Sequence, residues 1–360
     1  MCRLAVVILS VAPAVFAGQI GFIQTDLASD VPGLAQTVDP DLVNAWGMGA
    51  SAGSPVWIGA NGSGKSVLYN GAGVKQGLVV GLPGDGSVTG VVFSGLAGSF
   101  NADSFLFANE DGTVSGWRGA LGTTAETLVA GNSSNVYKGL ADANIGGTEY
   151  AYLANFRNAS IDVLKGNAGA VNLTGTFRDP NLPAGYAPFD VQNLGGVLYV
   201  TYAVQDGTKH DDVAGAGNGI VDTFDLQGNF LQRLVTNDAL NSPWGLALAP
   251  LGFGDVGGDL LVGNFGDGTI HAYNPTTGAF VQELTDASGK PLVIDGLWGL
   301  RFGNGGSFGS PSTLYFTAGP DGESHGLFGD LTQTPEPATW GVAGVSLLAL
   351  ALRRRGRNAR

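Results

Sequence analysis

The feature that most constrains the fold is a pattern of short apolar runs that recurs about every 50 residues. Its clearest copy has apolar runs at residues 245–249 and 259–263, then an Asp-Gly pair, then an alternating run at 269–273. Asp-Gly between two such runs is a strong hairpin signal. A further run at 280–284 completes a four-stranded antiparallel meander. Because a sheet this small cannot bury both faces alone, it must pack against copies of itself.

The number of copies predicts the architecture. Six first strands are recognisable, at residues 44–48, 88–93, 136–140, 187–191, 242–246 and 296–300. With 60 Gly and only 13% charged residues, the chain is suited to strands and tight turns rather than to helices or disorder. We therefore predict an all-β fold, a six-bladed β-propeller of four-stranded antiparallel blades. The last unit has only three strands, and residues 21–29 resemble the fourth strand at 280–288, so the N-terminal strand should close the last blade.

The first 17 residues, MCRLAVVILSVAPAVFA, have the composition of a secretory signal peptide. Arg3 precedes an apolar stretch, and small residues precede a cleavage site after Ala17. A buried first strand is the alternative interpretation. Cleavage would remove Cys2, the only cysteine, so the mature propeller at residues 18–333 would contain no disulfide and no thiol nucleophile.

Residues 334–360 predict a second targeting element. A Pro-Glu-Pro motif precedes an apolar stretch at 338–352, which we expect to be a transmembrane helix, and a basic tail follows. This order resembles the PEP-CTERM sorting signal of Gram-negative bacteria. The resemblance implies export through the inner membrane, processing by an exosortase-type protease, and delivery to the cell envelope, outer surface or extracellular polysaccharide matrix. A plain membrane anchor is the alternative. The residues that carry the signal are Pro335, Glu336, Pro337, Arg353, Arg354 and Arg355.

The charge of the chain excludes one class of partner. The formal net charge is −13, and the two terminal segments hold several of the arginines but only one acidic residue, Glu336. The remaining body is therefore more acidic than the whole chain. Such a body repels nucleic acid, and we expect no nucleic-acid partner.

One motif matches a nucleotide-binding pattern, but the residues that follow it do not fit a nucleotide site. Residues 59–66 fit the P-loop pattern G-x-x-x-x-G-K-[ST]. A P-loop continues into a helix, whereas here the apolar residues Val67, Leu68 and Tyr69 predict a strand. We therefore interpret the segment as a Gly-rich hairpin loop.

The meander predicts which loops share a face. Loops that lead into the first strands and loops that join second to third strands emerge at the same end of each blade. Aromatic residues follow the former, and acidic residues and Arg157 lie in the latter. This composition suits sugar stacking or cation capture; packing of blade against blade is the alternative for the rings. The candidate ligand-binding residues are Trp46, Tyr137, Phe189, Trp244, Trp298 and Arg157.

A long loop at residues 203–219 replaces a short turn in the fourth unit, and long loops in compact domains are often functional. His210, Asp211 and Asp212 in this loop, with His325 on the same predicted face, are candidates for acid–base or metal chemistry. A solvated acidic loop is the alternative. The sequence has no G-x-S-x-G elbow and no H-E-x-x-H motif, so the familiar hydrolase sites are missing.

Asparagines recur where second strands end, as at Asn264, and we interpret them as turn-forming residues. Lactonases of the gluconolactonase type hold a central divalent metal with Asn, Asp and Glu, and this chain resembles them in blade number only. A divalent metal such as calcium is therefore a possible cofactor. Its candidate ligands are Asp190, Asp212, Asp295 and Asn264.

Several segments together resemble a family of exported bacterial proteins with NHL- and YVTN-like propeller blades, which often end in PEP-CTERM signals. They are QTDLASD, PWGLALAP, KHDDVAGAGNG, GNFGDGTI, DGLWGLRFGNG and LYFTAGPDGESHGLFG, and the resemblance spans roughly residues 24–331. It implies a propeller and export, and it brings no catalytic residues. The sequence thus favours a binding or scaffold module for polysaccharide or another envelope component. The alternative is a metal-dependent lactonase or hydrolase with its site in the axial pocket.

Overall fold

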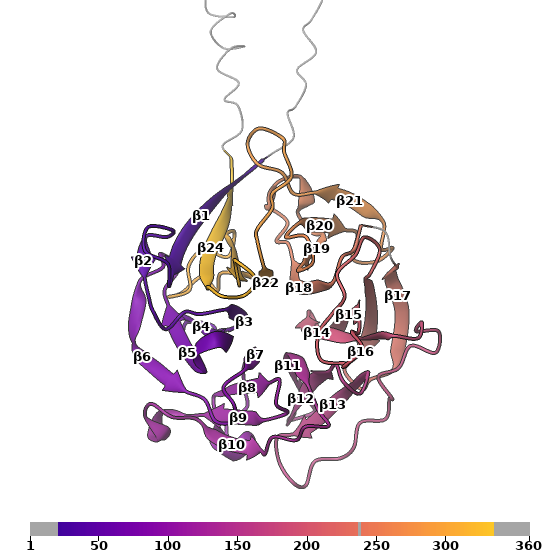
Figure 1. Ribbon diagram of the computed structural model, residues 1–360. Helices are drawn as coiled ribbons and strands as arrows, with labels where there is room; N and C mark the ends of the chain where they lie inside the picture. The colour runs from indigo at the N-terminus through magenta and orange to yellow at the C-terminus, as the bar shows by residue number, and fades with distance from the viewer. Residues whose placement is uncertain (1–20, 237–238, 335–360) are drawn as a thin grey trace, which may run out of the picture.

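The computed structural model describes residues 21–236 and 239–334, which form six sheets arranged in a ring (Figure 1). The predicted six-bladed propeller is confirmed. The signal peptide and the sorting signal predicted from the sequence lie outside the described residues, as does the transmembrane helix expected at 338–352. No helix within the described ranges is long and apolar enough to cross a membrane.

The first three blades follow one another along the chain. Blade 1 consists of β3 (Ala45–Gly49), β4 (Val56–Ala60), β5 (Lys65–Tyr69) and β6 (Lys75–Gly81). Blade 2 consists of β7 (Val88–Phe93), β8 (Phe105–Asn109), β9 (Val114–Trp117) and β10 (Glu126–Val129). Blade 3 consists of β11 (Tyr137–Ile145), β12 (Thr148–Asn155) and β13 (Ser160–Lys165). Short 3-10 turns lie at η1 (Asn61–Ser63), η2 (Phe100–Ala102), η3 (Gly119–Leu121) and η4 (Gly254–Val256).

The other three blades complete the ring. Blade 4 consists of β14 (Tyr186–Leu194), β15 (Val197–Val204), β16 (Ile220–Asp225) and β17 (Phe230–Thr236). Blade 5 consists of β18 (Pro243–Leu248), β19 (Leu260–Asn264), β20 (Ile270–Tyr273) and β21 (Phe280–Glu283). Blade 6 consists of β22 (Leu297–Phe302), β23 (Leu314–Ala318), β24 (Leu327–Gln333) and the N-terminal β1 (Phe22–Ser29), with the two-residue β2 (Thr37–Val38) outside it.

Closure of the ring by the N-terminal strand is confirmed. β1 pairs antiparallel with β24, from Phe22 opposite Gln333 to Ser29 opposite Leu327. The Thr334 backbone N–H also donates to the Gly21 carbonyl at 2.8 Å. Both ends of the described chain therefore lie side by side at the rim of blade 6 (Figure 1). Pairing the two ends removes the open edge that an unclosed ring would expose.

Blade 3 differs from the prediction because its sheet has three strands rather than four. The chain after β13 pairs instead with the outer hairpin of blade 4, where the N–H groups of Gly175 and Phe177 donate to the carbonyls of Gln227 and Gly228 at 2.8 and 2.9 Å. The buried Phe177 ring packs beside Tyr152. Burial of this ring between two blades anchors the segment away from β13.

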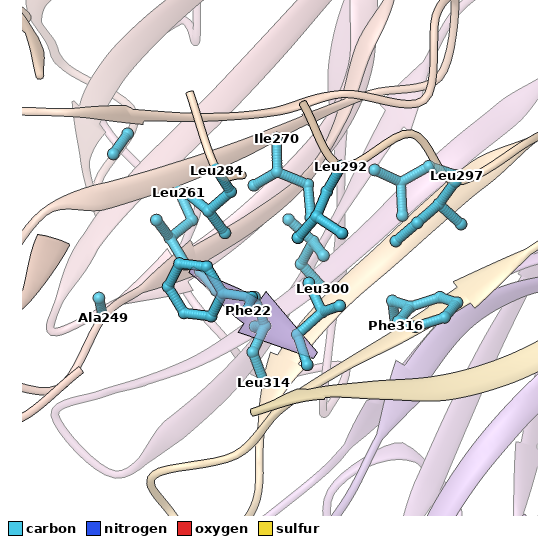
Figure 2. Packing of buried hydrophobic residues seen from close by; sticks show 14 of the residues in the cluster. Phe22, Ala249, Leu261, Ile270, Leu284, Leu292, Leu297, Leu300, Leu314 and Phe316 are labelled. Carbon is cyan, nitrogen blue, oxygen red and sulfur yellow. The ribbon is translucent and has the colours of Figure 1, made fainter. Parts of the chain in front are cut away.

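The apolar core is divided into layers between neighbouring blades. Figure 2 shows the layer between blades 5 and 6, where Phe22 of β1 lies among Leu261, Ile270 and Leu314. A seventh cluster lies at the axis and consists mainly of aromatic side chains. Because each layer joins two blades, the ring is stabilised by contacts between neighbours rather than by one central core.

A glycine recurs in the middle of the inner strands, where neighbouring blades meet most closely. A Cβ atom at Gly47 would lie 2.5 Å from the Thr89 carbonyl oxygen, and one at Gly245 would lie 2.5 Å from the Trp298 carbonyl oxygen. No side chain fits at such a distance. Blade 4 carries Asp190 at this position instead, and its side chain is completely buried.

The P-loop-like segment forms a turn and the strand β5, as the hairpin interpretation predicts. Asn61–Ser63 is the turn η1, and Lys65 begins β5 directly after it. The Lys65 ammonium forms an ion pair with Asp41 at 2.6 Å. The lysine that would hold a phosphate is therefore paired with a carboxylate, and no helix follows.

Candidate functional site

The candidate site lies at one end of the axis, which we call the upper face. There the first strand of each blade begins beside the end of the second strand, as the register pairs Ala45 with Ala60, Tyr137 with Asn155 and Pro243 with Asn264 show. Loops between second and third strands therefore emerge around the beginnings of the first strands. The opposite end of the axis is the lower face.

Two adjoining pockets open on the upper face, and together we call them the upper groove. The axial pocket has a volume of about 320 Å³, and its neighbour about 400 Å³. Glu110 and His210 line both, and Arg157 lines the second. The axial pocket is lined by Trp46, Glu110, Lys138, His210, Asp211, Asp212, Ala214, Phe265, Trp298 and Glu323. The blade 4 loop thus carries three of the candidate residues to the axis.

Lys138, which the sequence reasoning missed, is the centre of the polar group in the axial pocket. Its side chain is only 3% exposed, and its ammonium contacts the Glu110 carboxylate and lies 3.2 Å from Asp211 Oδ1. The same nitrogen lies 5.2 Å from the centre of the Trp46 ring. Burial alone would lower the pKa of Lys138, but the two carboxylates raise it above its usual value. Lys138 is therefore a charged ammonium and not a neutral nucleophile.

A signal for Lys138 was present in the sequence. When the six first strands are aligned on the recurring glycine, the residue before it is Trp46, Thr89, Lys138, Phe189, Trp244 and Trp298 in blades 1 to 6. One charged residue in a position otherwise occupied by aromatic rings and a threonine indicates a special role in that blade. The partners could not be found in this way, because Glu110 comes from blade 2 and Asp211 from blade 4.

The blade 4 loop is ordered by hydrogen bonds. The backbone N–H groups of Thr208 and His210 donate to Asp206 Oδ1 at 3.1 and 2.9 Å. His210 Nδ1 lies 2.8 Å from Asp211 Oδ1. Burial favours a higher pKa for Asp211, but Lys138 and His210 lower it below its usual value. Asp211 therefore presents an ionised carboxylate to the pocket.

Most of the predicted ligand-binding rings are buried. Trp46, Phe189, Trp244 and Trp298 are 1–2% exposed. Trp46 and Trp298 stack with centroids 3.5 Å apart, and Trp244 meets Trp298 edge-on at 5.7 Å. Their burial favours the interpretation that these rings pack blade against blade. A role for them in direct ligand contact stays a prediction.

The aromatic side chains of Tyr137 and Phe265 lie in different surroundings. Tyr137 belongs to the apolar layer between blades 2 and 3, where its hydroxyl lies 3.1 Å from Asp162 Oδ2. Phe265, which the sequence reasoning did not single out, is half-buried and lines the axial pocket. Its ring stacks on Trp298 with centroids 3.9 Å apart and an interplanar angle of 17°. The buried aromatic cluster therefore supports Phe265, which is the more accessible ring at the upper groove.

The four residues predicted as metal ligands lie apart in different settings. Asp190 is buried midway along the axis, where burial raises its pKa well above the usual value and Gln192 donates to it at 3.1 Å. Asp212 lines the axial pocket. Asp295 accepts the Asp321 backbone N–H at 2.9 Å. Asn264 holds the chain before β18, since its Nδ2 donates to the Ala239 carbonyl at 2.9 Å.

A different set of groups has the spacing of a metal site. Among the described residues, Glu110, His210 and Asp211 each offer a ligand atom within 4.8 Å of the others. Lys138 already pairs with both carboxylates of this set and supplies the positive charge that a cation would bring. The residues as arranged do not fit a divalent metal, because a bound ion would have to displace or repel the buried ammonium.

His325 does not line the upper groove. Its Nδ1 atom lies 2.9 Å from Asp30 Oδ2, and this carboxylate raises the pKa of His325. The Gly326 backbone N–H donates to the other oxygen of Asp30 at 2.8 Å. The pair therefore links the chain after β1 to the loop before β24. Glu323 from the same loop does reach the axial pocket, where Asn44 donates to it at 2.8 Å.

Comparisons with known proteins agree with this architecture. The PEP-CTERM protein-sorting motif matches residues 333–355. Among solved structures, a nutrient-binding protein from Bacteroides ovatus has a TM-score of 0.54 at 11% identity, covering 88% of this chain and 78% of that chain. A glucose dehydrogenase has a TM-score of 0.51 at 14% identity, covering 86% of this chain and 98% of that chain. At such low identities these likenesses show the fold alone. The protein is thus an exported six-bladed β-propeller that carries a signal for exosortase-type processing and an envelope or surface location.

Two related sequences give the family. The uncharacterized protein R648 of Acanthamoeba polyphaga mimivirus is 31% identical over 334 residues, covering 85% of this chain and 78% of that protein. The uncharacterized protein L690 of the same virus is 30% identical over 327 residues, covering 83% of each chain. The chain belongs to the same family as these two proteins. The narrower resemblance to the family of exported bacterial propellers stays a prediction.

Proposed function

We propose that this protein is an extracytoplasmic binding module whose upper groove holds a hydroxyl-rich, uncharged polysaccharide of the envelope or extracellular matrix. The observation that carries the proposal is the accessible Phe265 ring beside a group of carboxylates in one pocket. Aromatic faces stack on the apolar faces of sugar rings, and carboxylates accept hydrogen bonds from hydroxyl groups. The same combination of groups would not serve an apolar ligand.

The negative charge of the upper groove favours neutral polysaccharides over anionic ones. Four carboxylates, those of Glu110, Asp211, Asp212 and Glu323, line the axial pocket together with one lysine and one histidine. The whole chain is also acidic. A polyanionic polysaccharide would be repelled by such a surface, whereas a neutral chain would not.

The length of the groove favours a chain of sugar units. Glu110 and His210 line both the axial pocket of about 320 Å³ and its neighbour of about 400 Å³. Each volume lies in the range of small-ligand sites. Two adjoining pockets would accommodate consecutive units of an oligosaccharide, with Phe265 on one side and Arg157 on the other.

In this proposal the two terminal segments direct the export and processing of the protein. The signal peptide at residues 1–17 would start export, and the segment at 338–352 would hold the protein in the inner membrane until an exosortase-type protease cuts near Pro335–Pro337. β24 ends at Gln333, before the motif, so the cut would leave the ring closed. The domain boundaries that we propose are therefore 1–17, 18–333 and 334–360.

The test is a glycan array probed with the mature body, residues 18–334, together with metal analysis of the same sample. We expect retention on neutral oligosaccharides and no stoichiometric metal. Binding to acidic glycans alone would refute the proposal.

A metal-dependent lactonase or hydrolase is the second candidate, because Glu110, His210 and Asp211 have the spacing of a metal site. It requires that an ion displace the Lys138 ammonium from Glu110 and Asp211. One equivalent of bound metal that a His210→Ala, Asp212→Ala double variant loses would move the conclusion to this enzyme class. A lactone and ester screen would then identify its substrate.

A further inference from the structure

A second site lies at the lower face, at the opposite end of the axis. A pocket of about 460 Å³ is lined by residues of blades 1, 2, 3, 4 and 6, and a neighbouring pocket of about 270 Å³ shares three of them, Gln192, Asn193 and Arg301. We call the two together the lower mouth. Between it and the upper groove the axis narrows to a space of about 10 Å³ beside Asp190. The lower mouth is therefore separate from the groove described above.

Arg301 is the cation of the lower mouth. Its side chain lines both pockets as well as the narrow part of the axis. Arg118 and Arg233 form ion pairs with carboxylates elsewhere in the molecule, at 2.9 Å to Asp103 and 3.6 Å to Asp222. In the described ranges no salt bridge holds Arg301; burial lowers the pKa of this residue, and an ionised Asp142 would raise it. Its guanidinium is thus available to a ligand in the pocket.

The position of Arg301 is specific to blade 6. Two residues after the recurring glycine, the inner strands of blades 1 to 6 carry Gly49, Val92, Ala141, Gln192, Ala247 and Arg301. Five blades therefore place small, apolar or neutral groups at this level of the axis, and one places a positive charge there. The fold of the ring does not require that charge, since the other blades form the same strand without it.

Two acidic residues, Asp142 and Glu149, line the lower mouth together with Arg301. Asp142 and Glu149 are diagonal neighbours across β11 and β12. Burial and the nearby Glu149 raise the pKa of Asp142 to about 8, so its carboxyl is mostly protonated at pH 7 and is a hydrogen-bond donor. Glu149 is 2% exposed and accepts the Gly95 N–H at 3.2 Å. The pocket therefore presents a guanidinium and a neutral acid to an incoming ligand, beside the Glu149 carboxylate, whose two oxygens already accept from the Gly95 N–H and from Asn144 Nδ2.

We propose that the lower mouth binds a small molecule with a single carboxylate, such as a sugar acid, with Arg301 holding the carboxylate. The planar guanidinium matches a carboxylate with two parallel hydrogen bonds. Asp142 and the amides of Asn144 and Asn193, which line the same pocket, would contact the hydroxyl groups. A volume of about 460 Å³ suits a ligand of that size. The acidic body of the protein disfavours a polyanion, so a monovalent ligand fits better.

This site predicts a characteristic pH dependence. When the pH rises through about 8, Asp142 loses its proton and places a negative charge beside Arg301, and binding of a carboxylate weakens. The other groups that face Asp142 or Arg301 are Glu149 on β12, Tyr152 on the same strand, and Asp190 on β14 across the narrow part of the axis. Burial raises the pKa of Tyr152, which therefore stays neutral. Among these groups Asp142 is the one whose raised pKa, about 8, lies in this range.

The test is calorimetric titration of the mature body with sodium glucuronate at pH 7, with the methyl ester of glucuronate as the uncharged control. We expect the carboxylate to bind and the ester to bind at least about tenfold more weakly. Arg301→Gln should lose a similar factor, and Arg301→Lys should fall between it and the parent. Arg118→Gln removes an arginine whose ion pairs lie elsewhere and should bind as the parent does.

Circular dichroism would show whether Arg301→Gln is folded. A second variant tests the site even if Arg301→Gln does not fold. Asp142→Asn keeps a neutral side chain of similar shape, so it should bind glucuronate at pH 7 as the parent does and lose the weakening between pH 7 and 9. Equal binding of acid and ester, or unchanged affinity in folded Arg301→Gln, would overturn the proposal. Neutral oligosaccharide binding at the upper groove should be the same in both variants, so the two proposals can fail independently.

Discussion

Closure of the ring by β1 makes a prediction that one side chain can test. Phe22 is 2% exposed, and its ring lies 5.0 Å from that of Phe253 in the layer between blades 5 and 6 (Figure 2). Replacing a buried Phe by Ala removes its transfer free energy and leaves a cavity, at a cost of about 3–5 kcal/mol. Phe22→Ala should therefore lower the free energy of unfolding by this amount, although it lies at the very start of the described fold.

The neighbouring residue provides a matched control. Ile23 is 46% exposed on the opposite side of the same strand, and Ile23→Thr keeps a β-branched residue there. It should change stability by no more than about 0.5 kcal/mol. Denaturant midpoints followed by the fluorescence of the buried tryptophans would measure both variants of the mature body. The proposed closure by β1 is wrong if the free energy of unfolding of Phe22→Ala lies within about 1 kcal/mol of that of the parent. It is also wrong if Ile23→Thr lowers the free energy of unfolding as much as Phe22→Ala does.

Three other predictions concern the axis and the rim. Lys138→Met leaves the Glu110 carboxylate, 12% exposed, without its ammonium and should cost about 3–5 kcal/mol in denaturant unfolding, while Lys138→Met with Glu110→Gln should recover most of it. Gly245→Val places a side chain against the Trp298 carbonyl and should cost at least about 1–3 kcal/mol, whereas Gly252→Ala, with open space around it, should be neutral in the same assay. The pKa of His325 is raised by Asp30, so its contribution to stability is fully present below pH 6.5 and is lost as the pH rises through the folded value. His325→Gln should lose less stability than the parent between pH 6 and 8, and an identical pH profile would count against the pairing.

The sequence predicted the blade number and the closure because both depend on patterns that each blade repeats. Every blade needs apolar strands of the same length, and a glycine such as Gly245 is required wherever inner strands meet closely. The resemblance of residues 21–29 to a fourth strand was readable for the same reason. Blade 3 could not be predicted in this way, since its missing strand results from contacts of Phe177 with another blade.

The candidate site was predictable only in part. The long loop placed His210 and Asp211 on the upper face, because its position between second and third strands decides its end of the blade. Lys138, Phe265 and Arg301 were missed, although the alignment of the first strands shows two of them as exceptions to the repeat. Ion pairs such as that of Lys138 with Glu110 join different blades, and no local pattern predicts them.

The most direct test of the proposed function is the affinity of the upper groove for a neutral oligosaccharide selected from the glycan array. The measurement compares the parent with Phe265→Leu, which keeps an apolar side chain on Trp298 but removes the aromatic face. An aromatic stacking contact contributes about 0.5–1.5 kcal/mol, so we expect roughly a twofold to thirteenfold loss of affinity. Asp211→Asn should weaken binding as well, and Arg118→Gln should not. An affinity that is the same in Phe265→Leu, Asp211→Asn and the parent would show that the oligosaccharide binds elsewhere.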